Sequence, residues 1–213
     1  VNFFKAEKKY IAWEDYDAWL RVSNIYKNFY FINKSLGFIF IDNEQSVYVS
    51  DNGNNLNRLF FPSGLYVNQC EEIYVTERMN GRITRWIEGE EKVEIVVGGN
   101  GQGSELNQLY DPYDVTLDSS GHIYVADWRN DRLMKWVSGS SEGVIINPQR
   151  SWGVDIDAFD NIYATQYYSE SVIKLTPIDG SYTPTIEVGG NGYGNDLNQL
   201  TRPAGLNVDD DGN

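Results

Sequence analysis

A five-residue pattern that recurs four times constrains the fold of this chain more than any other feature. It reads apolar, tyrosine, small apolar, small, polar, and it occupies residues 47–51, 73–77, 123–127 and 162–166. Twelve residues before each tyrosine lies an opening position, at residues 36, 62, 112 and 151, and Pro203 begins a fifth copy. Twelve residues after three of the tyrosines lies a large apolar anchor: Trp86, Trp136 or Leu175. Constant spacing on both sides of one residue indicates an internal structural repeat.

Each copy predicts four short antiparallel strands. After the opening position, apolar residues alternate as in a strand, for example at 64–67, and a polar turn such as 118–121 follows. The tyrosine pattern is the second strand, residues 132–136 exemplify the third, and residues 94–97 the fourth. Because one such sheet cannot bury both of its faces, neighbouring copies must stack. Radial stacking of four-stranded sheets predicts an all-β fold, a β-propeller.

The third copy resembles the NHL repeat. The residues that carry the resemblance are Asp118, Gly121, Ile123, Tyr124, Val125, Ala126, Asp127, Asn130, Arg132, Lys135 and Trp136. The second copy keeps Asn80, Arg82, Arg85 and Trp86, whereas the fourth has Ser169, Ser171 and Leu175 at the Asn, Arg and Trp positions. The resemblance covers about residues 36–213. It implies a propeller, most often six-bladed, that serves as a binding platform.

The spacing of the copies departs from a regular propeller. Successive opening positions lie 26, 50, 39 and 52 residues apart. The shortest copy has no room for a third and fourth strand. The two longest copies contain glycine-rich stretches, at 98–103 and 189–194, which we interpret as turns between blades because strands flank them. Six blades of about 40–45 residues need more than this chain provides. We therefore expect incomplete or degenerate blades, in a fragment or in a ring closed by its N-terminal segment, and self-association if the ring is open.

Residues 1–35 form a separate, aromatic-rich segment without the repeated pattern. Two interpretations remain open. The first, which we favour, is that degenerate strands from this segment complete the last blade beside residues 203–213. The second is a short helix with Trp13, Tyr16 and Leu20 on one face. The repeats occupy residues 36–213 in either case.

Composition excludes several classes of function. The net charge is −14, from 31 acidic and 17 basic residues, and an acidic surface repels nucleic-acid backbones. No apolar run approaches the roughly 20 residues of a membrane span. One cysteine and one histidine exclude an internal disulfide framework and any site built from several histidines. No signal-peptide pattern is present in this segment, so both extracellular and cytoplasmic locations stay open.

Candidate binding residues follow from propeller topology. The loop before the first strand of a blade and the loop between its second and third strands lie on the same rim, and here they are rich in aromatic residues and arginine, the usual types at binding hot spots. The candidates are Arg78, Asn80, Arg82, Tyr113, Trp128, Arg129, Asn130, Trp152, Tyr167, Tyr168 and Arg202. The favoured hypothesis is a non-catalytic binding or scaffold module for a protein, peptide or glycan. The alternative for the two tryptophans is packing between blades.

The alternative function is a metal-dependent hydrolase or lyase. Similar propellers, such as the peptidyl-hydroxyglycine amidating lyases, use histidine-bound zinc, which one histidine cannot supply. Asp155 is the candidate metal ligand, because it occupies an inner first-strand position equivalent to Tyr66, Thr116 and Asn207. Ca²⁺ is the cofactor that such an oxygen ligand suits. The carboxylates that close the second strands, Asp51, Glu77 and Asp127, either bind a cation or accept local backbone N–H groups. We name no catalytic residue.

Overall fold

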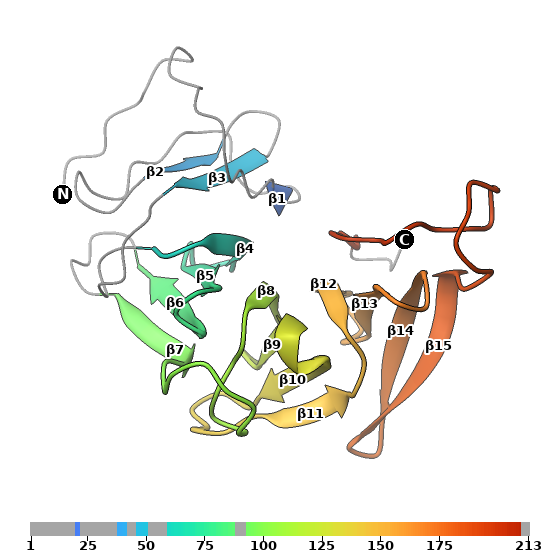
Figure 1. The fold of residues 1–213 in the computed structure, drawn as a ribbon. Helices are drawn as coiled ribbons and strands as arrows, with labels where there is room; N and C mark the ends of the chain where they lie inside the picture. The colour runs from blue at the N-terminus through green and yellow to red at the C-terminus, as the bar shows by residue number, and fades with distance from the viewer. Residues whose placement is uncertain (1–19, 22–37, 42–45, 51–58, 88–92, 210–213) are drawn as a thin grey trace, which may run out of the picture.

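The computed structural model describes residues 20–21, 38–41, 46–50, 59–87 and 93–209. This part of the chain consists of β-strands and a single 3-10 helix. The strands form three antiparallel sheets of four strands and one sheet of three. Figure 1 shows the sheets side by side around an arc, with β4, β8 and β12 on its inner side and β7, β11 and β15 on its outer side. The fold is therefore the all-β propeller arrangement that the repeat predicts.

The three complete sheets follow the predicted strand order. The first sheet contains β4 (Pro62–Val67), β5 (Ile73–Glu77), β6 (Arg82–Trp86) and β7 (Glu94–Gly98). The second contains β8 (Pro112–Leu117), β9 (Ile123–Asp127), β10 (Arg132–Trp136) and β11 (Val144–Asn147), with the 3-10 helix η1 (Trp128–Asn130) between β9 and β10. The third contains β12 (Ser151–Ile156), β13 (Ile162–Gln166), β14 (Ser171–Ile178) and β15 (Ser181–Gly189). Three predicted opening positions begin first strands, and three tyrosine patterns are second strands.

The N-terminal strand lies elsewhere than predicted. β1 (Leu20–Arg21), β2 (Phe38–Ile41) and β3 (Ser46–Ser50) form one sheet in the order β1-β3-β2, and Leu20 pairs with Val47. The described strand of the N-terminal segment thus extends the sheet of the first copy, and residues 203–209 form no strand. The two described residues of this segment therefore form no helix and do not pair with residues 203–209. The prediction that the segment completes the last blade otherwise concerns residues outside the described ones. Positions 36 and 51 lie outside the described residues.

Alternating burial in the middle sheet holds the three complete sheets together. In β9 and β10, Val125 and Met134 belong to the apolar cluster shared with the first sheet, whereas Tyr124 and Leu133 belong to the cluster shared with the third. Successive side chains of a strand point to opposite faces, so one strand can serve both clusters. The middle sheet is therefore buried on both faces.

The glycine-rich stretches are turns that leave one sheet and approach the next. After β7, Gly98, Gly99 and Gly101 have positive φ, and a parallel bridge between Gln102 and Leu109 closes the turn. A Cβ at Gly98 would lie 2.3 Å from the Gly81 carbonyl oxygen, so only glycine fits there. A second bridge, between Tyr193 and Leu200, follows β15 in the same way. No helix among the described residues is long and apolar enough to cross a membrane.

Candidate functional site

Five aromatic side chains meet on the rim where the second and third sheets adjoin. Tyr113 and Trp152 are the second residues of β8 and β12, Trp128 begins η1, and Tyr167 and Tyr168 follow β13. The ring centroids of Trp152 lie 4.2 Å from Tyr113 and 4.8 Å from Trp128, and Tyr167 lies 5.0 Å from Trp128. Tyr168 is 5.4 Å from Tyr167 and is 69% exposed, whereas the other four rings are half-buried. We call these five residues the aromatic surface.

Arginine side chains lie against the aromatic surface. The guanidinium of Arg78 is 3.9 Å from the centroid of Tyr113, and that of Arg150 is 4.8 Å from Trp128 and 5.0 Å from Tyr168. Arg202 lies 5.8 Å from Tyr167. These distances are within the range of cation–π attraction.

Carboxylates hold two of these arginines in place. Asp111 is 2% exposed; its carboxylate accepts a 2.7 Å bond from Arg78 and a 3.2 Å bond from Arg129. Asp131 accepts a bond from Arg150. Because the guanidinium groups are already ordered, a ligand that uses them loses little side-chain entropy. The surface can offer stacking faces and charge-assisted hydrogen bonds from one fixed arrangement.

The structure brings eight of the eleven predicted rim residues to this region and places three in internal clusters. Arg82 is 7% exposed and donates two 2.9 Å bonds to Glu77, and Asn80 donates a 2.7 Å bond to the same carboxylate. Asn130 likewise donates to Asp127, at 2.8 Å. These side chains close the turns of their own sheets, because a buried carboxylate needs local donors. We therefore leave Asn80, Arg82 and Asn130 out of the binding surface.

The carboxylates of Glu77 and Asp127, which close the second strands, accept their hydrogen bonds from groups within the protein. Asp127 accepts bonds from Arg132 at 2.7 Å and from the Tyr110 N–H at 2.7 Å, in addition to Asn130. Burial raises the pKa of both Glu77 and Asp127, while the neighbouring arginine in each case opposes that rise. Side-chain donors dominate both clusters, more than the backbone N–H groups expected from the sequence.

Two further carboxylates lie on the inner first strands β8 and β12 and bond the backbone of the segment beside them. Asp114 accepts the N–H of Val115 and that of Val154 in the next sheet, each at 2.9 Å. Asp155 accepts the Ile156 N–H at 2.9 Å and the Val208 N–H at 2.8 Å. Burial raises the pKa of Asp114 to about 7 and also raises the pKa of Asp155. Asp155 was expected as an inner polar residue, whereas Asp114 was not, because its repeat position holds glycine in the neighbouring copies.

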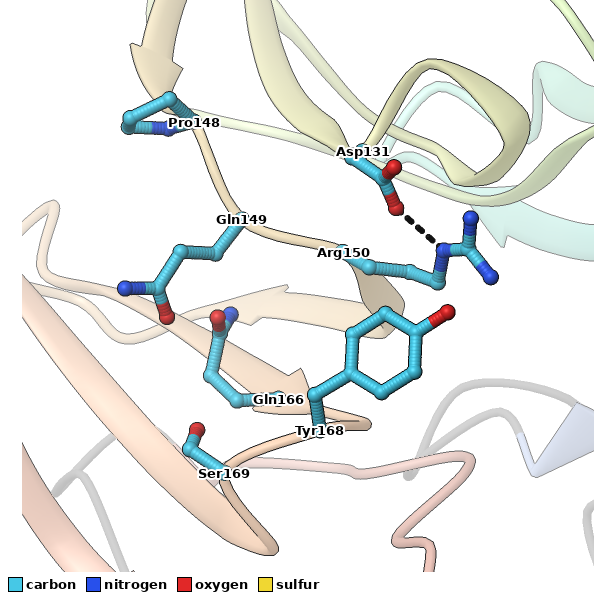
Figure 2. A pocket seen from close by; sticks show the side chains of 7 residues that line it. All are labelled: Asp131, Pro148, Gln149, Arg150, Gln166, Tyr168 and Ser169. Carbon is cyan, nitrogen blue, oxygen red and sulfur yellow. Dashed lines mark hydrogen bonds and ion pairs between the residues drawn. The ribbon is translucent and has the colours of Figure 1, made fainter.

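A hollow opens beside the aromatic surface, between the second and third sheets (Figure 2). Its volume is about 410 Å³. It is lined by Asp131, Pro148, Gln149, Arg150, Gln166, Tyr168 and Ser169. Sequence reasoning did not identify this site, although one signal was present: Gln166 stands where the other complete copies have Glu77 and Asp127.

Comparison with known proteins supports the fold. Residues 109–135 match the NHL repeat family. A gluconolactonase from Xanthomonas campestris superposes with a TM-score of 0.60 at 16% identity, covering 82% of this chain and 60% of that one. A streptogramin B lyase gives 0.57 at 14% identity, covering 86% and 58%. Virginiamycin B lyase from Staphylococcus aureus gives 0.52 at 16% identity, covering 78% and 51%. No curated protein sequence matches significantly.

These likenesses concern the architecture. The chain spans between about half and three-fifths of the length of these three neighbours. At such low identity the neighbours share its propeller arrangement, and their activities are not transferred with it. The NHL repeat and the propeller fold expected from the sequence are both confirmed.

Proposed function

We propose that this NHL-repeat propeller is a binding module whose aromatic surface recognises a protein, peptide or glycan ligand. The observation that carries the proposal is the convergence of five aromatic rings with arginines held by Asp111 and Asp131. Tryptophan, tyrosine and arginine contribute most binding energy in known interfaces. Flat rings beside ordered hydrogen-bond donors suit extended peptides and sugar rings. The acidic chain, with a net charge of −14, disfavours nucleic acids as ligands.

Peptide and glycan arrays would identify the ligand, and substitution of Trp128 would locate its site. We expect Trp128→Ala to weaken binding at least about tenfold, because a central hot-spot residue contributes about 2 kcal/mol or more. Phe159→Ala is the matched control, since Phe159 is 72% exposed and lies in the turn between β12 and β13, away from the aromatic surface. Affinity would be measured by titration calorimetry, with thermal unfolding alongside. Arrays without a ligand, or an unchanged affinity in Trp128→Ala, would refute the proposal.

A metal-dependent hydrolase or lyase is the second candidate. It is favoured by the enzymes among the structural neighbours and by Asp114 and Asp155, two carboxylates on adjacent inner strands. Asp155 would be the natural Ca²⁺ ligand, with Asp114 as a second ligand or a proton donor. The fit is poor, because both oxygens of each carboxylate already accept hydrogen bonds, and the described residues contain no group of three potential ligands. Calcium titration and lactone hydrolysis, each compared with Asp155→Asn, would test this candidate.

A further inference from the structure

The third complete sheet lacks an internal cluster that the other two sheets share. In those sheets, the last residue of the second strand is a carboxylate paired in register with an arginine: Glu77 with Arg82 and Asp127 with Arg132. In the third sheet the paired residues are Gln166 and Ser171. The asparagine that supports the carboxylate, Asn80 or Asn130, is replaced by Ser169. Three substitutions in the third sheet thus remove the carboxylate, the amide donor and the guanidinium that the other two sheets have.

In the second sheet the equivalent groups are present and occupy the space between the sheet and the connection that precedes it. Arg132 donates to Asp127 and also to the carbonyl oxygens of Ser104, Glu105 and Gln108, at 2.8 to 3.0 Å. Those carbonyls belong to the long connection between β7 and β8. The corresponding connection between β11 and β12 comprises only residues 148–150. The third sheet has therefore lost both the side chain and the loop that would occupy the hollow of about 410 Å³.

A buried hydrogen-bond acceptor remains at this hollow. Gln166 is 1% exposed and its Nε2 donates to Ser151 Oγ at 2.9 Å. Ser151 Oγ in turn donates to the Gln149 carbonyl oxygen at 3.4 Å, so the Gln166 amide presents its Nε2 to Ser151 in this arrangement. The Gln166 Oε1 is left with no partner among the described residues. Figure 2 shows the Gln166 side chain extending toward Gln149, with Tyr168 to one side of it.

The charge of the hollow selects the chemistry of its ligand. The carboxylate and the guanidinium of the other sheets are lost together, and the two charged residues that line the hollow, Asp131 and Arg150, form an ion pair with each other. A cationic group would be buried here against a neutral acceptor, which is unfavourable without a counter-charge. A neutral planar group that donates N–H avoids that cost. Asn130 provides the precedent, because its carboxamide donates to the equivalent acceptor, Asp127.

We propose that this hollow binds the carboxamide of an asparagine or glutamine side chain in a peptide ligand, with its N–H donated to Gln166 Oε1. Ser169, whose hydroxyl lies 3.0 Å from that of Ser171, also lines the hollow and supplies a hydroxyl donor for the carboxamide oxygen, and the exposed ring of Tyr168 offers a stacking face. Arg150 contacts both Trp128 and Tyr168, so the hollow is continuous with the aromatic surface. The inference rests on the proposed function and narrows its ligand to a peptide.

Small probes test the chemistry directly. Propionamide and propionate share one shape, and ethylguanidinium adds one N–H group between the ethyl chain and its planar head. The three probes differ in charge and in hydrogen-bonding groups. We expect propionamide to give saturable NMR shifts at the Gln166 side-chain amide and the Ser169 N–H, with Kd on the order of 10 mM for so small a ligand. The two charged probes should bind at least about tenfold more weakly. No saturable shift with propionamide, or equal binding of ethylguanidinium, would overturn the proposal.

Three variants locate the site. Gln166→Glu creates a carboxylate acceptor and should reverse the preference, so that ethylguanidinium binds more tightly than propionamide. The double variant Gln166→Glu with Ser171→Arg restores the internal pair of the other sheets and should abolish propionamide binding. Gln166→Met, which removes the acceptor at similar volume, provides the same readout if the double variant does not fold. Propionamide shifts that persist in the double variant or in Gln166→Met would place the ligand elsewhere.

The test separates this inference from the proposed function. A ligand found on the arrays should still bind the double variant through the aromatic surface, with only its Asn or Gln preference lost. Arrays that yield a ligand without such a preference contradict the carboxamide site alone. Arrays without any ligand, with normal propionamide shifts, contradict the proposed function alone.

Discussion

At the scale of single residues, Asp114 couples the junction between two sheets to pH. Its carboxylate joins the second sheet to the third through the Val154 N–H, and burial raises its pKa to about 7. The ordinary pKa of 3.8 applies to the unfolded chain, so the folded protein binds the extra proton between about pH 4 and 7. The penalty of ionising Asp114 is therefore absent below that window and fully present above it.

Stability should accordingly fall as the pH rises from 6 to 8. For a folded pKa of about 7, the contribution of Asp114 to the free energy of unfolding decreases by about 1.4 kcal/mol over this range. Urea unfolding at both pH values would measure the change. The Asp114→Asn variant cannot ionise at this position, so its unfolding free energy should change by about 1.4 kcal/mol less between pH 6 and 8 than that of the unmodified protein. The pH dependence that comes from the other acidic residues should remain. Parallel curves for the two proteins would contradict the assignment.

At the scale of elements, the turn after β7 depends on one backbone position. Gly98 has a φ of 71°, and a Cβ there would lie 2.3 Å from the Gly81 carbonyl oxygen. Gly101 has a φ of 80° but open space around its Cβ position. Gly101→Ala should cost about 1–2 kcal/mol of unfolding free energy, because only the left-handed backbone is strained. Gly98→Ala adds a collision with backbone and should cost about 2 kcal/mol more. Denaturant unfolding of both variants tests this, and equal losses would refute the close approach.

The elements also show how far sequence reasoning reaches. Local periodicity and the tyrosine spacing were sufficient to predict β4 to β15, because within each complete sheet every strand pairs with its neighbour in sequence. Pairing of β1 with β3 was missed, because β1 lies more than 20 residues from β3 and does not carry the repeated pattern. Propeller topology predicted which arginines lie near the rim, but it could not separate exposed ones from buried ones. Arg82 was predicted with them and is buried against Glu77. The hollow at Gln166 exists because the third sheet lacks the carboxylate, arginine and asparagine of the other two sheets. A search for residues that match between copies does not detect such a loss.

At the scale of the whole molecule, the complete sheets form a row in which each contacts only its neighbours. One apolar cluster joins the first and second sheets and another joins the second and third. In such an array, stability is approximately a sum of the stability of each unit and of its interfaces. The second sheet, which has a partner on both faces, should therefore open least often.

Hydrogen exchange measured along the chain would reveal this order. Ile83 in the first sheet and Ile173 in the third are both buried, and Ile→Val at either site removes one methylene at a cost of about 1 kcal/mol. Because each side chain belongs to the cluster that its sheet shares with the second sheet, each substitution should accelerate amide exchange most, about fivefold, in its own outer sheet and leave the outer sheet at the other end unchanged. The strands β9 and β10 should remain the slowest to exchange. Val125→Ala, in the middle sheet, should instead accelerate exchange in the first and second sheets together, because it weakens the interface between them. Uniform acceleration by Ile173→Val would mean that the three sheets unfold as one cooperative unit, and the row of separable sheets would have to be abandoned.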